Sequence, residues 1–167
     1  MRVVLALTAV LAVMPMAACA QPNPAANAAS APAAPAAQSG VSFLAQNALA
    51  DGVVTTASGL QYKVIRSGPA TGAHPGANDT ATVNYEGKLL SGEVFDSSYT
   101  RNKPATFEVG GVIPGWTEAL ELMRPGDEWM LYIPPKLAYG FEQKGPIPPG
   151  SVLIFKVELI STGAQPD

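Results

Sequence analysis

The sequence predicts an α+β domain in which a twisted antiparallel β-sheet of about five strands wraps around one short amphipathic helix. Beyond residue 53, short apolar or alternating segments are separated by Gly, Pro, Asn and Asp, which is typical of antiparallel strands and turns. Between them, one stretch carries apolar residues at helical spacing. A single apolar stripe of this kind is expected to pack across the concave face of a twisted sheet.

The N-terminal part is not expected to belong to this domain. Residues 1–20 have the pattern of an export signal, with Arg2 as its basic start, an apolar stretch too short to span a bilayer, and small residues around Cys19. Residues 21–41 consist almost entirely of Ala, Pro, Gln, Asn and Ser, which predicts a disordered linker. Residues 42–52 are compatible with a short helical lead-in.

Cys19 is the sole cysteine, so no intramolecular disulfide is expected. Residues 16–19 (Met-Ala-Ala-Cys) resemble a lipobox, which implies cleavage before Cys19, a diacylglycerol on its thiol and, with Ala following it, anchoring in the outer membrane. Alternatively, cleavage follows Ala20, because residues 18–20 (Ala-Cys-Ala) also fit the small-x-small pattern of the general signal peptidase. The protein would then be soluble in the periplasm. Both alternatives place it in a bacterial cell envelope.

Alternation of apolar and polar residues predicts the strands of the domain, which is expected over residues 53–163. The last strand shows the pattern clearly, because Leu153 and Phe155 would face the core while Lys156 and Glu158 face solvent. The expected strands lie near residues 60–64, 81–85, 105–109, 128–133 and 152–160.

Trp116, Ala119, Leu120 and Met123 form the apolar stripe of the predicted helix, because they fall at positions i, i+3, i+4 and i+7. Residues 124–126 (Arg-Pro-Gly) should end it. The groove between this helix and the sheet is the expected functional site.

Composition and motifs argue against several classes of function. A net charge of -3 without a basic cluster gives no footprint for nucleic acid. One histidine, His74, and one cysteine cannot supply the usual zinc ligands, so no metal is expected. His74 lies in a loop of Pro and Gly, and the chain has no Gly-x-Ser-x-Gly elbow for a nucleophilic serine. It also lacks nucleotide-binding fingerprints, so no cofactor is expected.

Five motifs follow one another along the domain: Val83-Asn84-Tyr85-Glu86-Gly87, Phe95-Asp96-Ser97-Ser98, Val112-Ile113-Pro114-Gly115-Trp116, Leu137-Ala138-Tyr139-Gly140, and Ile147-Pro148-Pro149 with Leu153-Ile154-Phe155. Together they resemble the FKBP family of peptidyl-prolyl cis-trans isomerases over about residues 55–160. Residues 55–62 are most similar to the bacterial macrophage infectivity potentiator subgroup. The long helical dimerisation region of that subgroup is absent, so a monomer is expected.

The resemblance implies an FKBP-like fold and an activity. The activity is non-covalent acceleration of X-Pro bond rotation in proteins that fold outside the cytoplasm, without metal or cofactor. The implied partners are proline-containing unfolded or partly folded proteins, and macrolide inhibitors that compete for the pocket. A proline-segment-binding chaperone module with little turnover is the alternative, because pocket residues alone do not report turnover.

Carried over position by position, the resemblance implies an aromatic pocket with Trp116 as its floor. The expected catalytic residues are Asp96, Tyr139 and Tyr85: the Tyr139 hydroxyl would donate to a substrate carbonyl, while Asp96, with Tyr85 and Arg101 as partners, would act electrostatically. The expected substrate-binding residues are Phe95, Phe107, Val112, Ile113, Trp116, Ile147 and Phe155.

Local pattern alone favours different roles for some of these residues. Asp96 would begin a turn with the two serines that follow it, and Trp116, Phe107 and Phe155 would belong to the core. The family motif favours the site for Asp96, and a groove floor can combine both roles for the aromatic residues. Residues 141–150 are expected to form a flap beside the groove.

Overall fold

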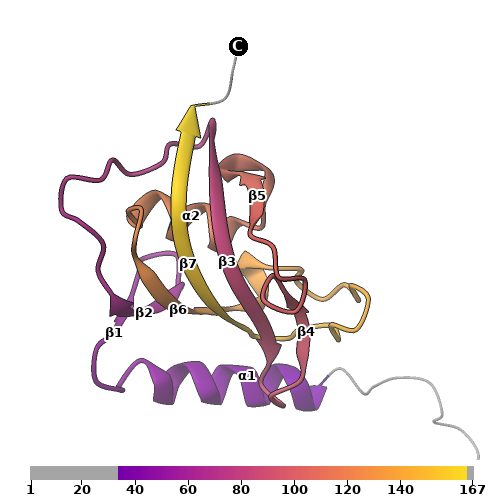
Figure 1. Cartoon of the computed structure of the whole chain (residues 1–167). Coiled ribbons are helices and arrows are strands. Elements are labelled where there is room, and N and C mark those ends of the chain that lie inside the picture. Colours follow the sequence, from indigo (N-terminus) through magenta and orange to yellow (C-terminus); the bar gives the residue numbers. More distant parts are fainter. Residues whose placement is uncertain (1–33, 165–167) are drawn as a thin grey trace, which may run out of the picture. The chain divides into compact units, whose positions relative to one another are not determined.

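A computed structural model describes residues 34–164, with side chains from 39 to 163. The expected export signal, Cys19 and the first part of the expected linker lie outside the described residues. A seven-stranded sheet curls around helix α2 (Pro114–Leu122), and a second helix, α1 (Ala34–Asn47), lies across one end of the sheet (Figure 1). The α+β fold class is confirmed, whereas the expected number of strands was too small.

All strand pairs are antiparallel, in the order β1-β2-β6-β7-β3-β4, and β5 also pairs with β3. The five predicted strands are present. The two that were missed, β1 and β4, have only three and four residues, and neither shows alternation of apolar and polar residues. The strands are β1 Val53–Thr55, β2 Gln61–Arg66, β3 Asp79–Leu89, β4 Val94–Ser97, β5 Ala105–Glu108, β6 Glu128–Ile133 and β7 Leu153–Ala164.

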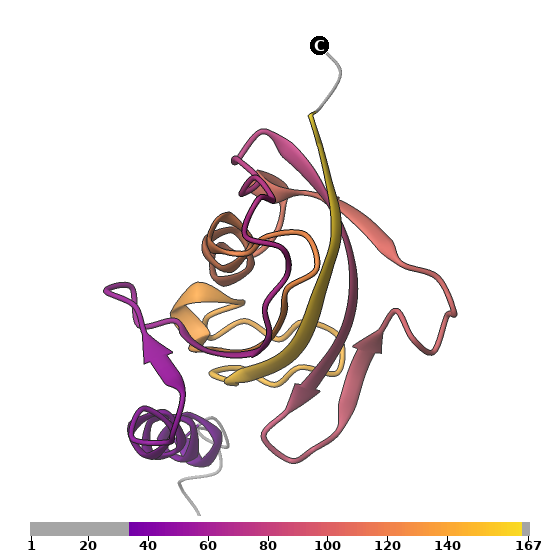
Figure 2. The ribbon, with the colours of Figure 1, turned by 60° about the vertical axis from the view of Figure 1, so that its left-hand side comes forward.

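The core lies between α2 and the concave face of the sheet, where β3 and β7 curve around the helix (Figure 2). Every second residue of β3 from Ala81 onward is buried, as alternation predicts. The four residues of the predicted apolar stripe on and just after α2 are at most 4% exposed. These residues, all buried against the sheet, are Trp116, Ala119, Leu120 and Met123.

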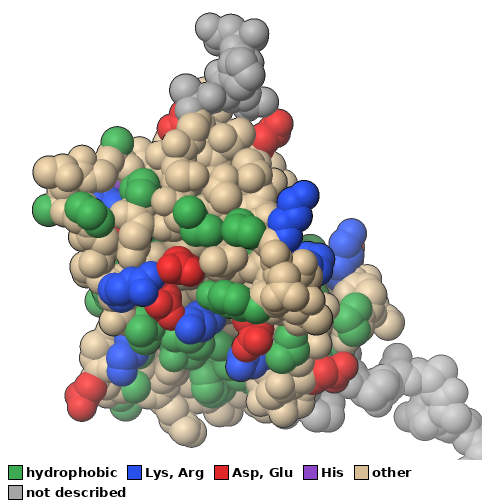
Figure 3. Space-filling view, viewed as in Figure 1, with side chains coloured by type: hydrophobic (Ala, Val, Ile, Leu, Met, Phe, Trp, Pro, Cys, Tyr) green, Lys and Arg blue, Asp and Glu red, His purple; other side chains and the backbone are tan. Residues whose placement is uncertain are grey.

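The outer face of the sheet carries acidic and basic side chains interspersed with hydrophobic ones (Figure 3). Arg66 Nη2 lies 2.5 Å from Glu158 Oε1, and Lys156 Nζ lies 2.7 Å from Glu128 Oε1. Exposed ion pairs contribute little stability. These ion pairs show that this face of the sheet is exposed to solvent. The expected groove lies on the other, concave face.

Helix α1 differs from the expectation. It begins at Ala34 and ends at Asn47, so the linker prediction was wrong for residues 34–41, and the predicted helix at 42–52 was placed too far along the chain. Alanine is the strongest helix former, and Pro35 falls in the first turn, where proline is tolerated. Among the described residues, no helix is both long and apolar enough to cross a bilayer.

Tertiary contacts hold α1 against the domain. Gly40 is buried, and a Cβ there would lie 2.8 Å from Val152 Cγ2, so the helix approaches the domain closely at this point. Further along, Asn47 Nδ2 donates to Gln61 Oε1 and Gln61 Nε2 donates to the Leu44 carbonyl, both at 2.8 Å. Such contacts stabilise a short helix that would be marginal in isolation.

Candidate functional site

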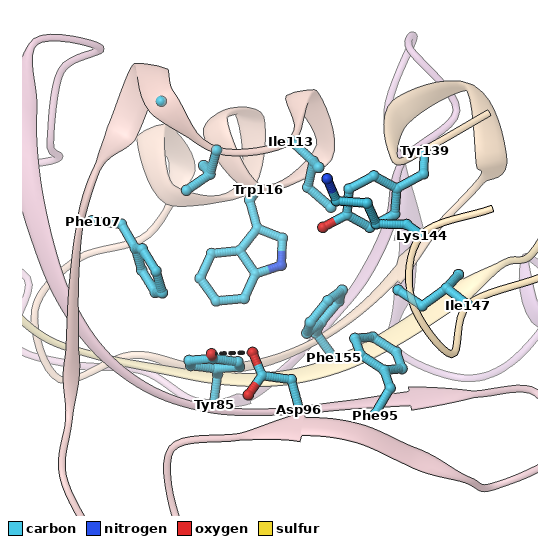
Figure 4. Close-up of a pocket in the computed structure, with 12 residues that line it drawn as sticks. Tyr85, Phe95, Asp96, Phe107, Ile113, Trp116, Tyr139, Lys144, Ile147 and Phe155 are labelled. Atoms are coloured by element: carbon cyan, nitrogen blue, oxygen red, sulfur yellow. Dashed lines mark hydrogen bonds between the residues drawn. The ribbon is translucent and has the colours of Figure 1, made fainter. Parts of the chain in front are cut away.

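A pocket of about 550 Å³ opens between α2 and the concave face of the sheet (Figure 4). It brings together all the residues that the sequence analysis placed at the substrate and adds two that were not predicted, Gly111 and Lys144. The expected residues that line it are Tyr85, Phe95, Asp96, Phe107, Val112, Ile113, Trp116, Tyr139, Ile147 and Phe155.

Trp116 is the centre of the aromatic cluster. Its ring meets those of Tyr85, Phe107 and Phe155 edge to face, with centroid separations of 5.3, 5.7 and 5.2 Å. This geometry is favoured because the positive edge of one ring meets the negative face of another. The partners come from β3, β5 and β7, so one helix and three strands form a rigid apolar floor. Trp116 therefore belongs to both the core and the pocket.

The start of α2 brings Trp116 over the sheet. Pro114 occupies the first turn of the helix, where the missing N–H leaves no intrahelical bond unmade. Gly115 allows the helix to approach β6 closely, because a Cβ there would lie 2.6 Å from Ile133 Cγ2. The Nε1 of Trp116 is buried and has no hydrogen-bond partner within the described part of the chain.

Gly87 on β3 supports two aromatic walls of the pocket. A Cβ at this position would lie 2.6 Å from Phe155 Cε1 and 2.7 Å from Phe95 Cζ. We expect Gly87→Ala to displace both rings and lower the free energy of unfolding by about 1 to 3 kcal/mol, as overpacking does. Urea denaturation measures the loss. Gly76→Ala is the control, because the nearest atom to a Cβ there is 3.5 Å away; equal stability of the two variants would contradict the packing argument.

Asp96 forms a polar cluster at one wall of the pocket. The Tyr85 hydroxyl donates to Asp96 Oδ2 and Arg101 Nη1 donates to Asp96 Oδ1, both at 2.5 Å, while Arg101 Nη2 donates to the Tyr85 oxygen at 2.8 Å. Both expected partners therefore contact the carboxylate. The side chain of Ser98, which follows in the same motif, bonds to the backbone of Tyr85 rather than to the carboxylate of Asp96. Its Oγ accepts from the Tyr85 N–H at 2.9 Å and so supports the local backbone. Asp96 lines the pocket.

The cluster keeps its members in fixed protonation states. Burial opposes ionisation of Asp96, but the hydrogen bonds from Tyr85 and Arg101 and the charge on Arg101 outweigh it and lower the pKa below its ordinary value. Burial, followed by the contact with Asp96, raises the pKa of Tyr85. At neutral pH the carboxylate is therefore ionised and the phenol keeps the proton that it donates.

The lowered pKa predicts how stability depends on pH. A group whose pKa falls on folding stabilises the native state fully above its ordinary pKa, and this contribution is lost as pH falls through the folded value. We expect the Asp96 contribution to be constant from pH 8 to about 5 and to be lost as pH falls further, through the lowered pKa of the folded state. It should stay under about 1 kcal/mol because the side chain is 43% exposed. Comparing urea denaturation of wild type and Asp96→Asn across this range tests it; a difference growing toward low pH would contradict it.

Residues 141–150 lie beside the pocket, as expected for a flap, and contribute two lining residues. One of them, Ile147, is 5% exposed and packs into the core. Tyr139 precedes the flap, and its hydroxyl has no hydrogen-bond partner among residues 34–164. Figure 4 shows this ring at the pocket edge opposite Asp96. The hydroxyl is thus available as a donor to a bound molecule.

His74 lies in a loop and is exposed, and both of its ring nitrogens have partners. Arg124 Nε donates to His74 Nε2, and His74 Nδ1 lies within hydrogen-bond distance of the Met123 carbonyl, each at 3.0 Å. These two contacts tie the loop of His74 to the end of α2. The described residues contain no cluster of three or more His, Cys, Asp or Glu side chains that could hold a metal.

Comparisons with known protein families agree with the geometry. The family described as FKBP-type peptidyl-prolyl cis-trans isomerase matches residues 72–160. A second family, described as the domain amino terminal to FKBP-type peptidyl-prolyl isomerase, matches residues 8–64.

Individual curated proteins are also similar to this chain in sequence. The chain is 56% identical over 122 residues to the peptidyl-prolyl cis-trans isomerase Mip of Coxiella burnetii, covering 72% of the chain and 52% of that protein. It is 54% identical over 123 residues to the outer membrane protein MIP of Legionella longbeachae, with 73% and 52% covered. The chain therefore spans about half the length of the curated relatives it matches.

Two solved structures resemble the fold. FkpA from Escherichia coli superposes with a TM-score of 0.77 at 43% identity, covering 80% of this chain and 62% of FkpA. A peptidyl-prolyl cis-trans isomerase from Pseudomonas syringae superposes with a TM-score of 0.73 at 37% identity, covering 81% of this chain and 98% of that structure.

Proposed function

The chain belongs to the FKBP-type peptidyl-prolyl cis-trans isomerase family, and we propose that it accelerates rotation about X-Pro peptide bonds in proteins folding outside the cytoplasm. The observation that carries the proposal is the aromatic pocket with Trp116 at its floor, together with a hydroxyl donor on one side and an ionised carboxylate on the other. The substrates proposed are proline-containing unfolded or partly folded proteins.

The physical task is to lower a barrier that comes from amide resonance. Twisting a peptide bond loses this resonance at a cost of about 18–20 kcal/mol, and uncatalysed X-Pro isomerisation takes tens to hundreds of seconds. The planar amide is strongly dipolar and well hydrated, whereas the twisted amide carries less charge on its oxygen. An apolar pocket therefore disfavours the planar ground state relative to the twisted state. Four decades of acceleration require only about 5 to 6 kcal/mol.

The pocket residues divide this task. The proline ring is proposed to rest on Trp116, enclosed by Tyr85, Phe107 and Phe155, where it is desolvated and held by contact with aromatic faces. The Tyr139 hydroxyl donates to a substrate carbonyl and holds one end of the bond while the other rotates. All steps are non-covalent, and neither metal nor cofactor is required.

Asp96 is proposed to act electrostatically. Arg101 and Tyr85 satisfy its oxygens, so the carboxylate stays ionised and fixed at the pocket wall and does not act as a base. A fixed charge beside the rotating amide stabilises a particular orientation of its dipole without any reorganisation during the reaction.

The test is the cis-to-trans rate of short X-Pro peptides with the purified chain, measured with and without a macrolide inhibitor. Acceleration abolished by the macrolide supports both the activity and the pocket. A folded protein that accelerates none of a series of peptides with different residues before proline would overturn the enzymatic proposal.

A chaperone role is the second candidate, favoured by the exposed apolar side chain of Phe141, which is 73% exposed on the flap beside the pocket. Exposed apolar groups at the rim of a site can bind unfolded chains. Tyr139→Phe separates the two roles, because it removes a donor without changing the apolar surface. Slower isomerisation with unchanged suppression of aggregation would show that the activities are distinct. Parallel losses would show that both depend on the pocket.

The cellular setting is also a proposal: an exported protein anchored in the outer membrane by a lipid on Cys19. The support is the lipobox-like sequence and the similarity to the outer membrane protein MIP of Legionella longbeachae. Incorporation of labelled palmitate into wild type but not Cys19→Ala tests the lipid, and loss of the variant from the membrane fraction tests the anchor. Unlabelled wild-type protein in the soluble periplasmic fraction would favour cleavage after Ala20.

We propose a monomer for the same protein, the oligomeric state that the sequence analysis expects. Sedimentation equilibrium of the purified chain measures its mass directly. A mass of twice the chain would overturn this proposal without affecting the others.

A further inference from the structure

Lys144 is placed at the pocket by a tight turn in the flap. The Lys144 N–H donates to the Ile147 carbonyl at 3.1 Å, and the Ile147 N–H donates to the Lys144 carbonyl at 3.0 Å. The turn needs Gly145 because its φ is +55°, in the region that favours glycine, and Pro146 stiffens the next position. Ile147 is buried in the core, so the backbone of Lys144 is fixed from within the domain.

The side chain of Lys144 lines the pocket. Its Nζ lies 6.0 Å from the centre of the Tyr139 ring, and Figure 4 shows it beside that ring, close to Ile113. The ammonium group therefore lies near the ring that carries the hydroxyl proposed to hold the substrate carbonyl.

The charge of Lys144 is not neutralised within the described residues. Its Nζ has no carboxylate within 4.0 Å among residues 34–164, and Glu142 in the same flap makes no ion pair with it. The carboxylate that lines the pocket, Asp96, is already bonded to Arg101 and Tyr85. The pocket thus combines a compensated negative charge with an uncompensated positive charge.

We propose that Lys144 makes the site selective for prolines preceded by an acidic residue. This inference rests on the proposed function. If Tyr139 donates to the carbonyl of the residue before proline, that residue's side chain starts one carbon away from the same carbonyl and falls within reach of Lys144. A carboxylate there forms an ion pair with Lys144 that neutral or basic side chains cannot form. The chain's net charge of -3 opposes acidic peptides at long range, so such a preference has to come from local contact.

The experiment compares kcat/KM for matched peptides with Glu, Gln, Lys or Leu before proline, measured by a protease-free assay. We expect wild type to prefer Glu over Gln by about two- to fivefold at low salt, as for a solvent-exposed ion pair, and less at 0.5 M salt. Lys144→Gln should bring the Glu to Gln ratio to about one, and Lys144→Glu should instead favour Lys. Lys63→Gln is the control for net charge, because Lys63 is on β2 and does not line the pocket.

The outcomes separate this inference from the function on which it rests. Turnover of the Leu and Gln peptides establishes the isomerase whatever the preference is. With that turnover present, a wild-type Glu to Gln ratio near one, or a ratio lost equally in Lys63→Gln, overturns the role of Lys144. Absence of turnover for every peptide overturns the proposed function and this inference together. Circular dichroism of each variant confirms that the flap substitutions leave the domain folded.

Discussion

Trp116→Ala is expected to lower both stability and activity more than any other single change at the pocket. The side chain is 4% exposed and contacts three aromatic rings, so its removal should reduce the free energy of unfolding by about 3 to 5 kcal/mol. In a domain of this size, such a loss lowers Tm by more than about 10 °C. In the folded fraction, kcat/KM should fall by about 100-fold or more, because the proline ring loses its floor.

Trp129→Ala provides a matched control. Trp129 is 6% exposed, its Nε1 is also unpartnered among the described residues, and it stacks on Tyr62 with a centroid separation of 4.3 Å, but it does not line the pocket. Both variants should lose comparable stability, so a rate comparison at a temperature where both are folded isolates the site. Trp116→Phe serves if the alanine variant does not fold. Equal rate losses in the Trp116 and Trp129 variants would show that Trp116 acts only through stability.

The strands that were predictable from sequence are those with one buried and one exposed face. In β7, buried apolar residues alternate strictly with outward-facing residues from Leu153 to Leu159, so the pattern alone locates the strand. β4 shows why others were missed: its four residues have no alternation, and it is held by pairing with β3. Strand β1 likewise depends on its neighbour β2. Pairing with a neighbouring strand is not recorded in the periodicity of the short strand itself.

Helix α1 was misplaced for a related reason. The composition of residues 34–41 is that of a linker, and nothing in it indicates a buried face. The burial of Gly40 against Val152 exists only once the flap and the sheet have formed. A glycine at a close contact looks the same in sequence as a glycine in a flexible segment, so the helix could not have been bounded from local pattern.

The prediction of the pocket residues was complete where the family motifs cover them and incomplete elsewhere. Lys144 lies in the flap outside those motifs, and Gly111 has no side chain to indicate a role. The Lys-Gly-Pro-Ile sequence at residues 144–147 does carry a signal, since glycine followed by proline favours a turn that brings the flanking residues together. That the turn places the lysine at the pocket follows only from the tertiary structure.

Asp96→Ala is expected to lower kcat/KM about tenfold or more while changing the free energy of unfolding by less than about 1 kcal/mol. The stability effect is small because the side chain is 43% exposed. The rate effect is larger because the substitution removes the charge from the pocket wall and breaks the bonds that Asp96 accepts from the Tyr85 hydroxyl and from Arg101. Steady-state kinetics on one peptide and urea denaturation, measured on the same preparation, give both quantities.

Asp127→Ala should lower stability and leave the rate unchanged, the opposite of Asp96→Ala. Comparing the two variants therefore tests the role of Asp96. Asp127 is 7% exposed and accepts backbone N–H bonds from Gly68 and Arg124, outside the pocket. Its removal leaves two part-buried N–H donors unpaired, so about 1 to 3 kcal/mol of stability should be lost while kcat/KM of the folded protein is kept. Local sequence pattern assigns Asp96 to a turn as well. If Asp96→Ala loses stability and keeps its rate, as Asp127→Ala should, the turn is its role and the electrostatic function is excluded. If it loses rate alone, the carboxylate acts on the substrate amide.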